Sequence, residues 1–276
     1  MTRFFDTAVS SQFLAALKDM GGIVSHWRSW LTLGNHDIKH RYRGSVLGPF
    51  WITLSMAALI GALYLVYGGV FNGDENGDKS RLGYIYYLAA SMPIWYLLSD
   101  CIKNGCVCFS EEPLLKQIKL PYSVYVARVI WRNFVIFIHN IGIFVIVLVL
   151  FRSAARPHFA LLAIGLIILF VNVGWLIVIF GTICARFRDV AQIVENFIGM
   201  LFFISPIMWT PSLVKDKAYI IDYNLLNHFM ELVRQPILGA IPTAANYQVS
   251  LISAAIGWLV ALAVFTKFRR RLAYWV

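Results

Sequence analysis

Charged residues are scarce in this chain. Asp, Glu, Lys and Arg make up only 14% of its 276 residues, whereas hydrophobic residues make up 59% and the mean hydropathy is +0.69. A soluble domain is about a quarter charged and about half apolar, so this composition excludes an ordinary soluble fold. No polar stretch is long enough to hold a separate soluble domain, and we expect residues 1–276 to form a single transmembrane domain.

Cysteines are few, and a nucleotide-binding motif is absent. Cys101, Cys106, Cys108 and Cys184 lie in or beside apolar runs, where a reduced thiol behaves as a small hydrophobic group. Their spacing does not favour a metal site. The phosphate-binding pattern G-x-x-x-x-G-K-[ST] does not occur in the sequence. We therefore expect no metal, cofactor or catalytic residue in this chain, and ATP-driven transport would need ATP and Mg bound by another polypeptide.

Six apolar runs are long enough to cross a bilayer as helices. A hydrocarbon core of about 30 Å needs about 20 helical residues, and the runs lack the alternation of barrel strands. The sequence therefore predicts an all-α, polytopic membrane protein. Its six transmembrane helices are expected near residues 45–71, 83–108, 124–151, 158–184, 190–210 and 247–266.

The distribution of Lys and Arg predicts the orientation of these helices. With a cytoplasmic N-terminus, 17 of the 24 Lys and Arg residues fall on the cytoplasmic side, as the positive-inside rule requires. Both termini are then cytoplasmic. The formal net charge of +10 is divided among short clusters between apolar runs, which does not favour nucleic-acid binding.

Three segments do not read as transmembrane helices. Residues 5–20 carry apolar side chains at three- and four-residue spacing, which suits an interface helix on the membrane surface or a helix packed on the protein. In residues 109–121, Pro113 can begin a helix and Pro121 ends it, which leaves a charged loop or a short cytoplasmic helix. Residues 205–242 predict re-entrant or interfacial helices on the outer side.

Lys39, Arg41 and Arg43 form a basic cluster just before the first transmembrane run. Such cations anchor the topology of a membrane protein by their attraction to anionic lipid, which is one interpretation. Because guanidinium groups bind phosphate oxygens in a bidentate manner, the cluster could also bind the diphosphate head group of a lipid-linked substrate.

Several polar side chains lie within or near the apolar runs. Asp100 and Lys103 are three residues apart, so they share a helix face and we expect a structural ion pair. The remaining groups are candidates for a transport path or for contacts between helices: Arg128, Arg132, His139, Asn140 and Glu195.

Aromatic residues recur through the first and fifth apolar runs. Interfacial belts and core packing explain many of them, but the flat faces of aromatic rings could also line a channel for sugars. The candidates are Trp51, Tyr64, Tyr67, Phe71, Phe197, Phe202, Phe203 and Trp209.

The chain resembles the type-2 permeases of ABC transporters that export O-antigen and related polysaccharides. The resemblance begins with residues 37–55, DIKHRYRGSVLGPFWITLS. It continues in order through LKQIKLP at 115–121, RVIWRN at 128–133 with His-Asn at 139–140, RFRD at 186–189, SPIMWTP at 205–211 and AYWV at 273–276. These motifs together extend over nearly the whole chain.

The resemblance implies a homodimer paired with two copies of a separate ATP-binding cassette subunit. It also implies an interface helix at 5–20, a coupling helix at 111–120 and outer gate helices at 212–238. In such permeases the channel is attributed to the first and fifth helices, which favours the aromatic candidates above. The coupling residues would be Glu111, Glu112, Lys116 and Lys119. Residues 223–228 depart from the related pattern, which tends to read Asn-Pro there, so the start of the second gate helix is left open.

The expected function is the export of a lipid-diphosphate-linked polysaccharide, such as O-antigen, across a bacterial inner membrane. A capsule or teichoic-acid exporter would have the same architecture. An integral-membrane glycosyltransferase or polymerase would need a catalytic acidic motif in a loop. The loop acids Asp74, Glu75, Glu111 and Glu112 instead have flanks typical of turns and a helix start.

Overall fold

The computed structural model describes residues 2–48, 50–68, 77–110, 120–150, 156–211 and 219–275. These residues form helices joined by turns, without a strand among them. The helices are α1 (Thr2–Ser25), α2 (Trp27–Arg41), α3 (Phe50–Tyr67), α4 (Gly77–Val107), α6 (Tyr122–Leu150), α7 (Phe159–Arg186), α8 (Asp189–Ile204), α9 (Tyr219–Asp222), α10 (Leu225–Ile237) and α11 (Ala244–Trp275).

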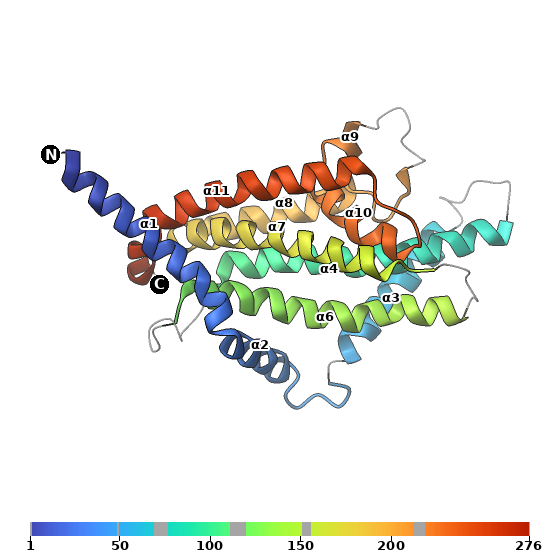
Figure 1. Ribbon diagram of the computed structural model, residues 1–276. Helices are drawn as coiled ribbons and strands as arrows, with labels where there is room; N and C mark the ends of the chain where they lie inside the picture. Colours follow the sequence, from blue (N-terminus) through green and yellow to red (C-terminus); the bar gives the residue numbers. More distant parts are fainter. Residues whose placement is uncertain are drawn as a thin grey trace.

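The long helices form an elongated bundle (Figure 1). Both chain termini lie at one end of it, which we call the inner end, and α9 and α10 lie toward the other, outer end (Figure 1). An even number of crossings returns a chain to the side on which it began, so this arrangement agrees with the predicted pairing of the two termini on one side.

Four of these helices are long and apolar enough to cross a membrane: α3, α6, α7 and α11. The prediction of an all-α, polytopic membrane protein is confirmed, whereas the count of six transmembrane helices stays a prediction. The 16 residues of α8 span only about 24 Å at 1.5 Å per residue. The 31-residue α4 is long enough but less apolar.

The lower hydropathy of α4 follows from its central position. It packs against α3, α6, α7, α8 and α10. From Leu88 to Leu98 nearly every side chain is buried, including Ser91. A helix covered by protein does not need the uniformly apolar surface that lipid demands of α6 or α7.

A seam of Gly and Trp joins α7 to α11. A Cβ on Gly257 would lie 2.3 Å from the Trp175 ring, and one on Gly174 would lie 3.0 Å from Trp258. Glycine is therefore required for this close approach. Trp175 Nε1 donates to Asn172 Oδ1 at 3.1 Å, and Asn172 Nδ2 donates to the Ser250 carbonyl at 3.0 Å.

The first helix is fastened to the inner end by one buried carboxylate. Asp19 is 5% exposed and accepts a hydrogen bond from Ser123 N, in the first turn of α6, at 3.2 Å. Its other oxygen accepts from Arg269 Nη2, near the end of α11, at 2.9 Å. The predicted helix at 5–20 lies within the longer α1. The next helix, α2, was not predicted from the sequence.

The outer end is held by a buried arginine. Arg234 of α10 is 1% exposed, and its Nη1 donates to Tyr87 Oη at 2.6 Å, to Ser91 Oγ at 3.2 Å and to the Pro206 carbonyl. Its Nη2 pairs with Glu231. We call these five residues the Arg234 cluster. The cluster fixes α10 to α4 and to the chain just after α8.

The start of α10, left open by the sequence, is at Leu225. Asn224 caps the helix, because its side chain accepts a hydrogen bond from Asn227 N at 3.3 Å. Residues 212–218 of the predicted gate segment lie outside the described residues; the short α9 and α10 form the rest of it.

Candidate functional site

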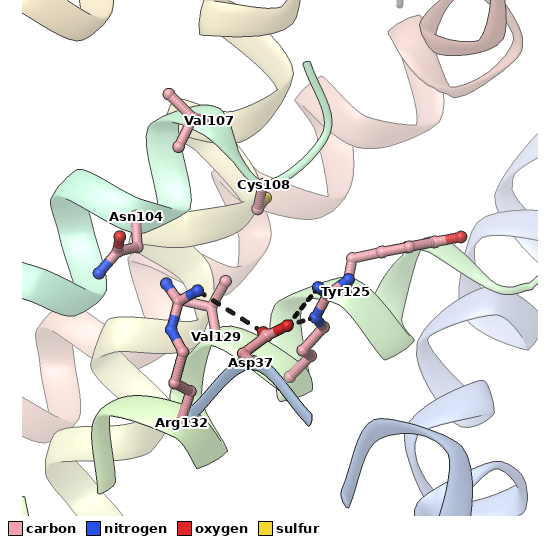
Figure 2. Close-up of a pocket in the computed structure, with 8 residues that line it drawn as sticks. Asp37, Asn104, Val107, Cys108, Tyr125, Val129 and Arg132 are labelled. Carbon is pink, nitrogen blue, oxygen red and sulfur yellow. Dashed lines mark hydrogen bonds and ion pairs between the residues drawn. The ribbon is translucent and has the colours of Figure 1, made fainter. Parts of the chain in front are cut away.

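Two polar cavities lie between helices of the bundle, the first toward its inner end and the second nearer to its middle. The first, which we call the Asp37 cavity, measures about 220 Å³ and is bounded by α2, α4 and α6. Figure 2 shows its lining, with Asn104 on one side and the Asp37 carboxylate between the guanidinium groups of α6.

Asp37 fastens α2 to α6 through two arginines one helical turn apart. Arg128 donates from Nε at 2.8 Å and from Nη2 at 2.6 Å, one bond to each carboxylate oxygen of Asp37. Arg132 Nη1 lies 3.6 Å from the same carboxylate. The side chains are partly buried, with exposures of 16% for Arg128, 23% for Arg132 and 13% for Asp37. Two cations therefore share one anion, and the cavity is electropositive.

Neighbouring contacts orient the same pair of helices. Trp131 Nε1 donates to Asn35 Oδ1 at 3.0 Å, and the rings of Trp30 and Trp131 meet edge to face at 5.9 Å. A Cβ on Gly34 would lie 2.8 Å from the Trp131 ring, so Gly34 permits the close packing of α2 on α6. This packing places the last turn of α2, with its cations, beside the start of α3.

The second cavity lies between α3, α4 and α6 and measures about 250 Å³; we call it the Asn140 cavity. Its polar lining consists of Arg41, Ser55, Tyr96, Asp100 and Asn140, with Tyr42 at the end of α2. Asn140 is 2% exposed, and its Oδ1 has no hydrogen-bond partner among the described residues. An unpaired buried carbonyl oxygen costs about 1–3 kcal/mol, so a residue that lines this cavity has an unused acceptor.

Asp100 stands in the field of three cations rather than in an ion pair. Lys103, Arg41 and Arg132 act on its carboxylate electrostatically. Among the described residues, no ion pair at contact distance includes Asp100. The predicted ion pair between Asp100 and Lys103 is not at contact distance among the described residues, but Lys103 is the cation that acts most strongly on Asp100, and Asp100 also lines the cavity.

The three candidate head-group cations differ in whether they line a cavity. Arg41 lines the Asn140 cavity. Lys39, in the last turn of α2, and Arg43, just after it, are exposed. Of the polar groups that sequence analysis had named, Arg128 and Arg132 line the Asp37 cavity, whereas His139 bonds back to the Val135 carbonyl of its own helix at 2.8 Å.

The aromatic channel candidates fall into two groups. The more exposed ones are Trp51 at 48%, Phe197 at 57% and Phe203 at 65%. Tyr64, Tyr67 and Phe202 pack on the hydrophobic core, and Phe202 lies 5.8 Å from Trp95. Trp209 Nε1 donates to the Phe203 carbonyl at 3.0 Å. Phe71 lies outside the described residues.

The predicted coupling residues Glu111, Glu112, Lys116 and Lys119 also lie outside the described residues. The helices on either side are described: α4 ends at Val107, and α6 begins at Tyr122. Val107 and Cys108 line the Asp37 cavity, so this cavity adjoins the chain that leads into the predicted coupling segment. Among the described residues, no group of three His, Cys, Asp or Glu side chains could hold a metal ion.

The pattern of the ABC-2 type transporter family matches residues 28–238, well over half of the chain. This chain belongs to the ABC-2 type transporter family. The match begins in α2 and ends just after α10, so it includes both cavities and the Arg234 cluster. Membership makes the chain the membrane component of a transporter and not itself an enzyme.

Curated relatives of this transporter are similar over most of its length. An O-antigen export system permease protein of Klebsiella pneumoniae is 24% identical over 251 residues, which cover 88% of this chain and 93% of the relative. The protein of the same description from Myxococcus xanthus is 23% identical over 189 residues, covering 68% of this chain and 70% of the relative.

Sequence reasoning had not identified two features of the site. Asp37 was part of the family motif but had no assigned role, because its partners in α6 are some 90 residues away. Tyr96 was one of many aromatic residues. A single acid within a basic cluster was the available signal for Asp37, since it is the only anion near Lys39, Arg41 and Arg43 in the sequence.

Proposed function

We propose that this chain is the transmembrane subunit of an ATP-driven exporter that moves lipid-diphosphate-linked polysaccharide, most specifically O-antigen, across the bacterial inner membrane. The observation that carries the proposal is the similarity to O-antigen export permeases along nearly their whole length. The long apolar helices α3, α6, α7 and α11 support a membrane channel, and the electropositive inner end supports an anionic substrate.

The assembly that fits this function is a homodimer with two copies of an ATP-binding cassette subunit, which bind ATP and Mg. Support comes from two helices of the bundle that the single chain leaves largely uncovered. In α3 only Met56 and Ile60 are buried, and in α8 only Val194 and Ile198. The exposed face of α8 also carries Gln192 and Glu195, and lipid would penalise such groups, so a second copy or a watery channel is the better neighbour.

In this proposal both termini face the cytoplasm. The excess of Lys and Arg on that side and the position of both termini at one end of the bundle support it (Figure 1). The α1 helix then lies along the inner membrane surface, where its exposed Phe13, Leu14 and Leu17 can enter the lipid.

The substrate would approach from the cytoplasmic leaflet. Lys39, Arg41 and Arg43 would attract its diphosphate, and the exposed rings of Trp51, Phe197 and Phe203 would contact the glycan in the channel between α3 and α8. The segment at 111–120 would receive motion from the ATPase. Since α6 begins directly after that segment, a shift there would reach Arg128 and Arg132 through one rigid helix.

Deleting the gene in the bacterium that encodes it tests the proposal. We expect long glycan to disappear from surface lipopolysaccharide and lipid-linked glycan to accumulate in the inner membrane, with rescue by the native gene. A capsule or teichoic-acid exporter would instead remove that other polymer from the surface. The purified chain should hydrolyse no ATP until the cassette subunit is added, and a periplasmic location of either terminus would contradict the topology.

A further inference from the structure

We propose that the Asn140 cavity binds the first sugar of the lipid-linked glycan, the sugar attached to the diphosphate. This inference rests on the proposed function and names a part of the substrate that the head-group cations do not contact. It assigns Asn140, Asp100 and Tyr96 as sugar-binding residues and Arg41 as the adjoining phosphate contact.

The first argument is the unused acceptor. Asn140 is 2% exposed, lines the cavity, and keeps Oδ1 without a partner among the described residues. Asn172, which is also buried in the bundle, is by contrast satisfied internally: it donates to the Ile168 and Ser250 carbonyls and accepts from Trp175. A ligand with a hydroxyl or amide N–H donor would remove the cost of leaving Asn140 unpaired.

The second argument is the chemistry of the surrounding groups. Besides Asn140, the cavity presents the Asp100 carboxylate, the Ser55 hydroxyl and the Tyr96 side chain. This lining is rich in hydrogen-bond acceptors and includes an aromatic residue. A sugar offers several hydroxyl donors and apolar C–H surfaces, and so complements both.

Charge excludes the main alternative for an acceptor-rich cavity, which is a metal cation. Arg41 is part of the lining, and Lys103 and Arg132 act on Asp100 from nearby. Three cations around one carboxylate oppose a further positive charge. A neutral ligand with many donors meets no such opposition.

The size of the cavity also fits one sugar. About 250 Å³ lies just below the roughly 300–1,000 Å³ of pockets that bury drug-sized ligands, so the cavity suits a ligand of the size of one sugar. The Asp37 cavity is of similar size, but its carboxylate is already engaged by Arg128 and Arg132.

The position of the cavity agrees with a substrate that carries a phosphate beside its sugar. Arg41 reaches the cavity from the end of α2, next to the exposed Lys39 and Arg43. Ser55 lines the cavity and also belongs to the exposed face of α3, together with Trp51. A head group held by Arg41 would therefore place its first sugar in the cavity and the next ones along that face of α3.

Binding of two matched probes to the complex of this chain with its cassette subunit tests the inference. The probes are farnesyl diphosphate and farnesyl diphosphate bearing one N-acetylglucosamine. We expect the sugar-bearing probe to bind about tenfold more tightly, the effect of one additional hydrogen bond. Asn140→Leu and Asp100→Asn should remove this preference and leave binding of farnesyl diphosphate unchanged, whereas Arg41→Gln should weaken both probes.

Thermal unfolding separates a binding role from a structural one. Asn140→Leu keeps the side-chain size and removes an unpaired polar group, so the unfolding temperature should stay constant or rise, while Asn172→Leu should lower it. Ile138→Ala, on the exposed face of α6, should keep the sugar preference. Equal binding of the two probes by the native complex, or a preference that survives Asn140→Leu, overturns the inference. The deletion phenotype then decides the proposed function independently.

Discussion

The Arg234 cluster and the Asn140 cavity engage their central polar side chains to different extents. At the outer end, both terminal nitrogens of Arg234 are engaged by protein, through Tyr87, Ser91, the Pro206 carbonyl and Glu231. At the Asn140 cavity, Asn140 lines the space and its Oδ1 has no partner among the described residues. A buried polar group that is paired within the protein holds helices together, and one that is left unpaired in a cavity indicates a binding site.

The comparison extends to charge. The Arg234 cluster balances one cation with one anion, and both charged side chains are nearly inaccessible to water, with exposures of 1% for Arg234 and 7% for Glu231. The Asp37 cavity has two cations for one anion, and its side chains are between 13% and 23% exposed. Excess positive charge that water and ligands can reach suits an anionic substrate, whereas the balanced outer cluster suits a fixed joint between α10 and α4.

Breaking the outer pair should have the largest effect on stability. Glu231→Leu leaves the Arg234 guanidinium buried without its anion, and such a change costs about 3–5 kcal/mol. The double variant Glu231→Leu with Arg234→Met removes both charges and should recover most of the loss. Denaturant unfolding of the purified chain in detergent measures both. If the single variant were as stable as the native chain, the cluster would not hold α10.

The close approach of α7 and α10 should be the next most sensitive feature. A Cβ on Gly165 would lie 2.0 Å from the Leu232 carbonyl oxygen, so Gly165→Ala must displace the backbone of α10, at about 1–3 kcal/mol. Gly142→Ala is the matched control, because nothing lies within 4 Å of its added methyl group. Unfolding of the two variants side by side checks this, and equal stability would mean that α10 is free to shift.

The sequence predicted the helices that face lipid and was less informative about those that face protein. The apolar runs of α6, α7 and α11 are continuous because lipid surrounds much of their surface, so hydropathy alone located them to within a few residues, apart from an extended end of α11. The polar residues Asn35, His36 and Asp37 interrupt the pattern of α2, and its existence depends on contacts with α6 that hydropathy does not contain.

The candidate site was predicted in pieces. Arg41, Asp100 and Asn140 were each recognised as polar groups near or within the membrane, but they come from three different helices. Residue spacing can pair Asp100 with Lys103 along one helix, but it does not show that Arg41 and Arg132 from other helices also act on Asp100. Only the packing of α2, α4 and α6 brings these residues together.

The smallest expected effect lies at the inner end, where water already screens the charges. Asp37→Asn removes the anion shared by Arg128 and Arg132, and because all three side chains are partly exposed we expect a loss of about 1–2 kcal/mol, less than for the outer pair. The loss should be local, since Asp37 fastens only α2. Hydrogen exchange should therefore quicken in α2 and stay unchanged in α7 and α11.

Asn35→Ala is the matched control, because it removes a neutral contact with Trp131 and should quicken exchange in α2 less. If Asp37→Asn quickened hydrogen exchange in α7 as much as in α2, the effect would not be local, and Asp37 would stabilise more of the bundle than α2.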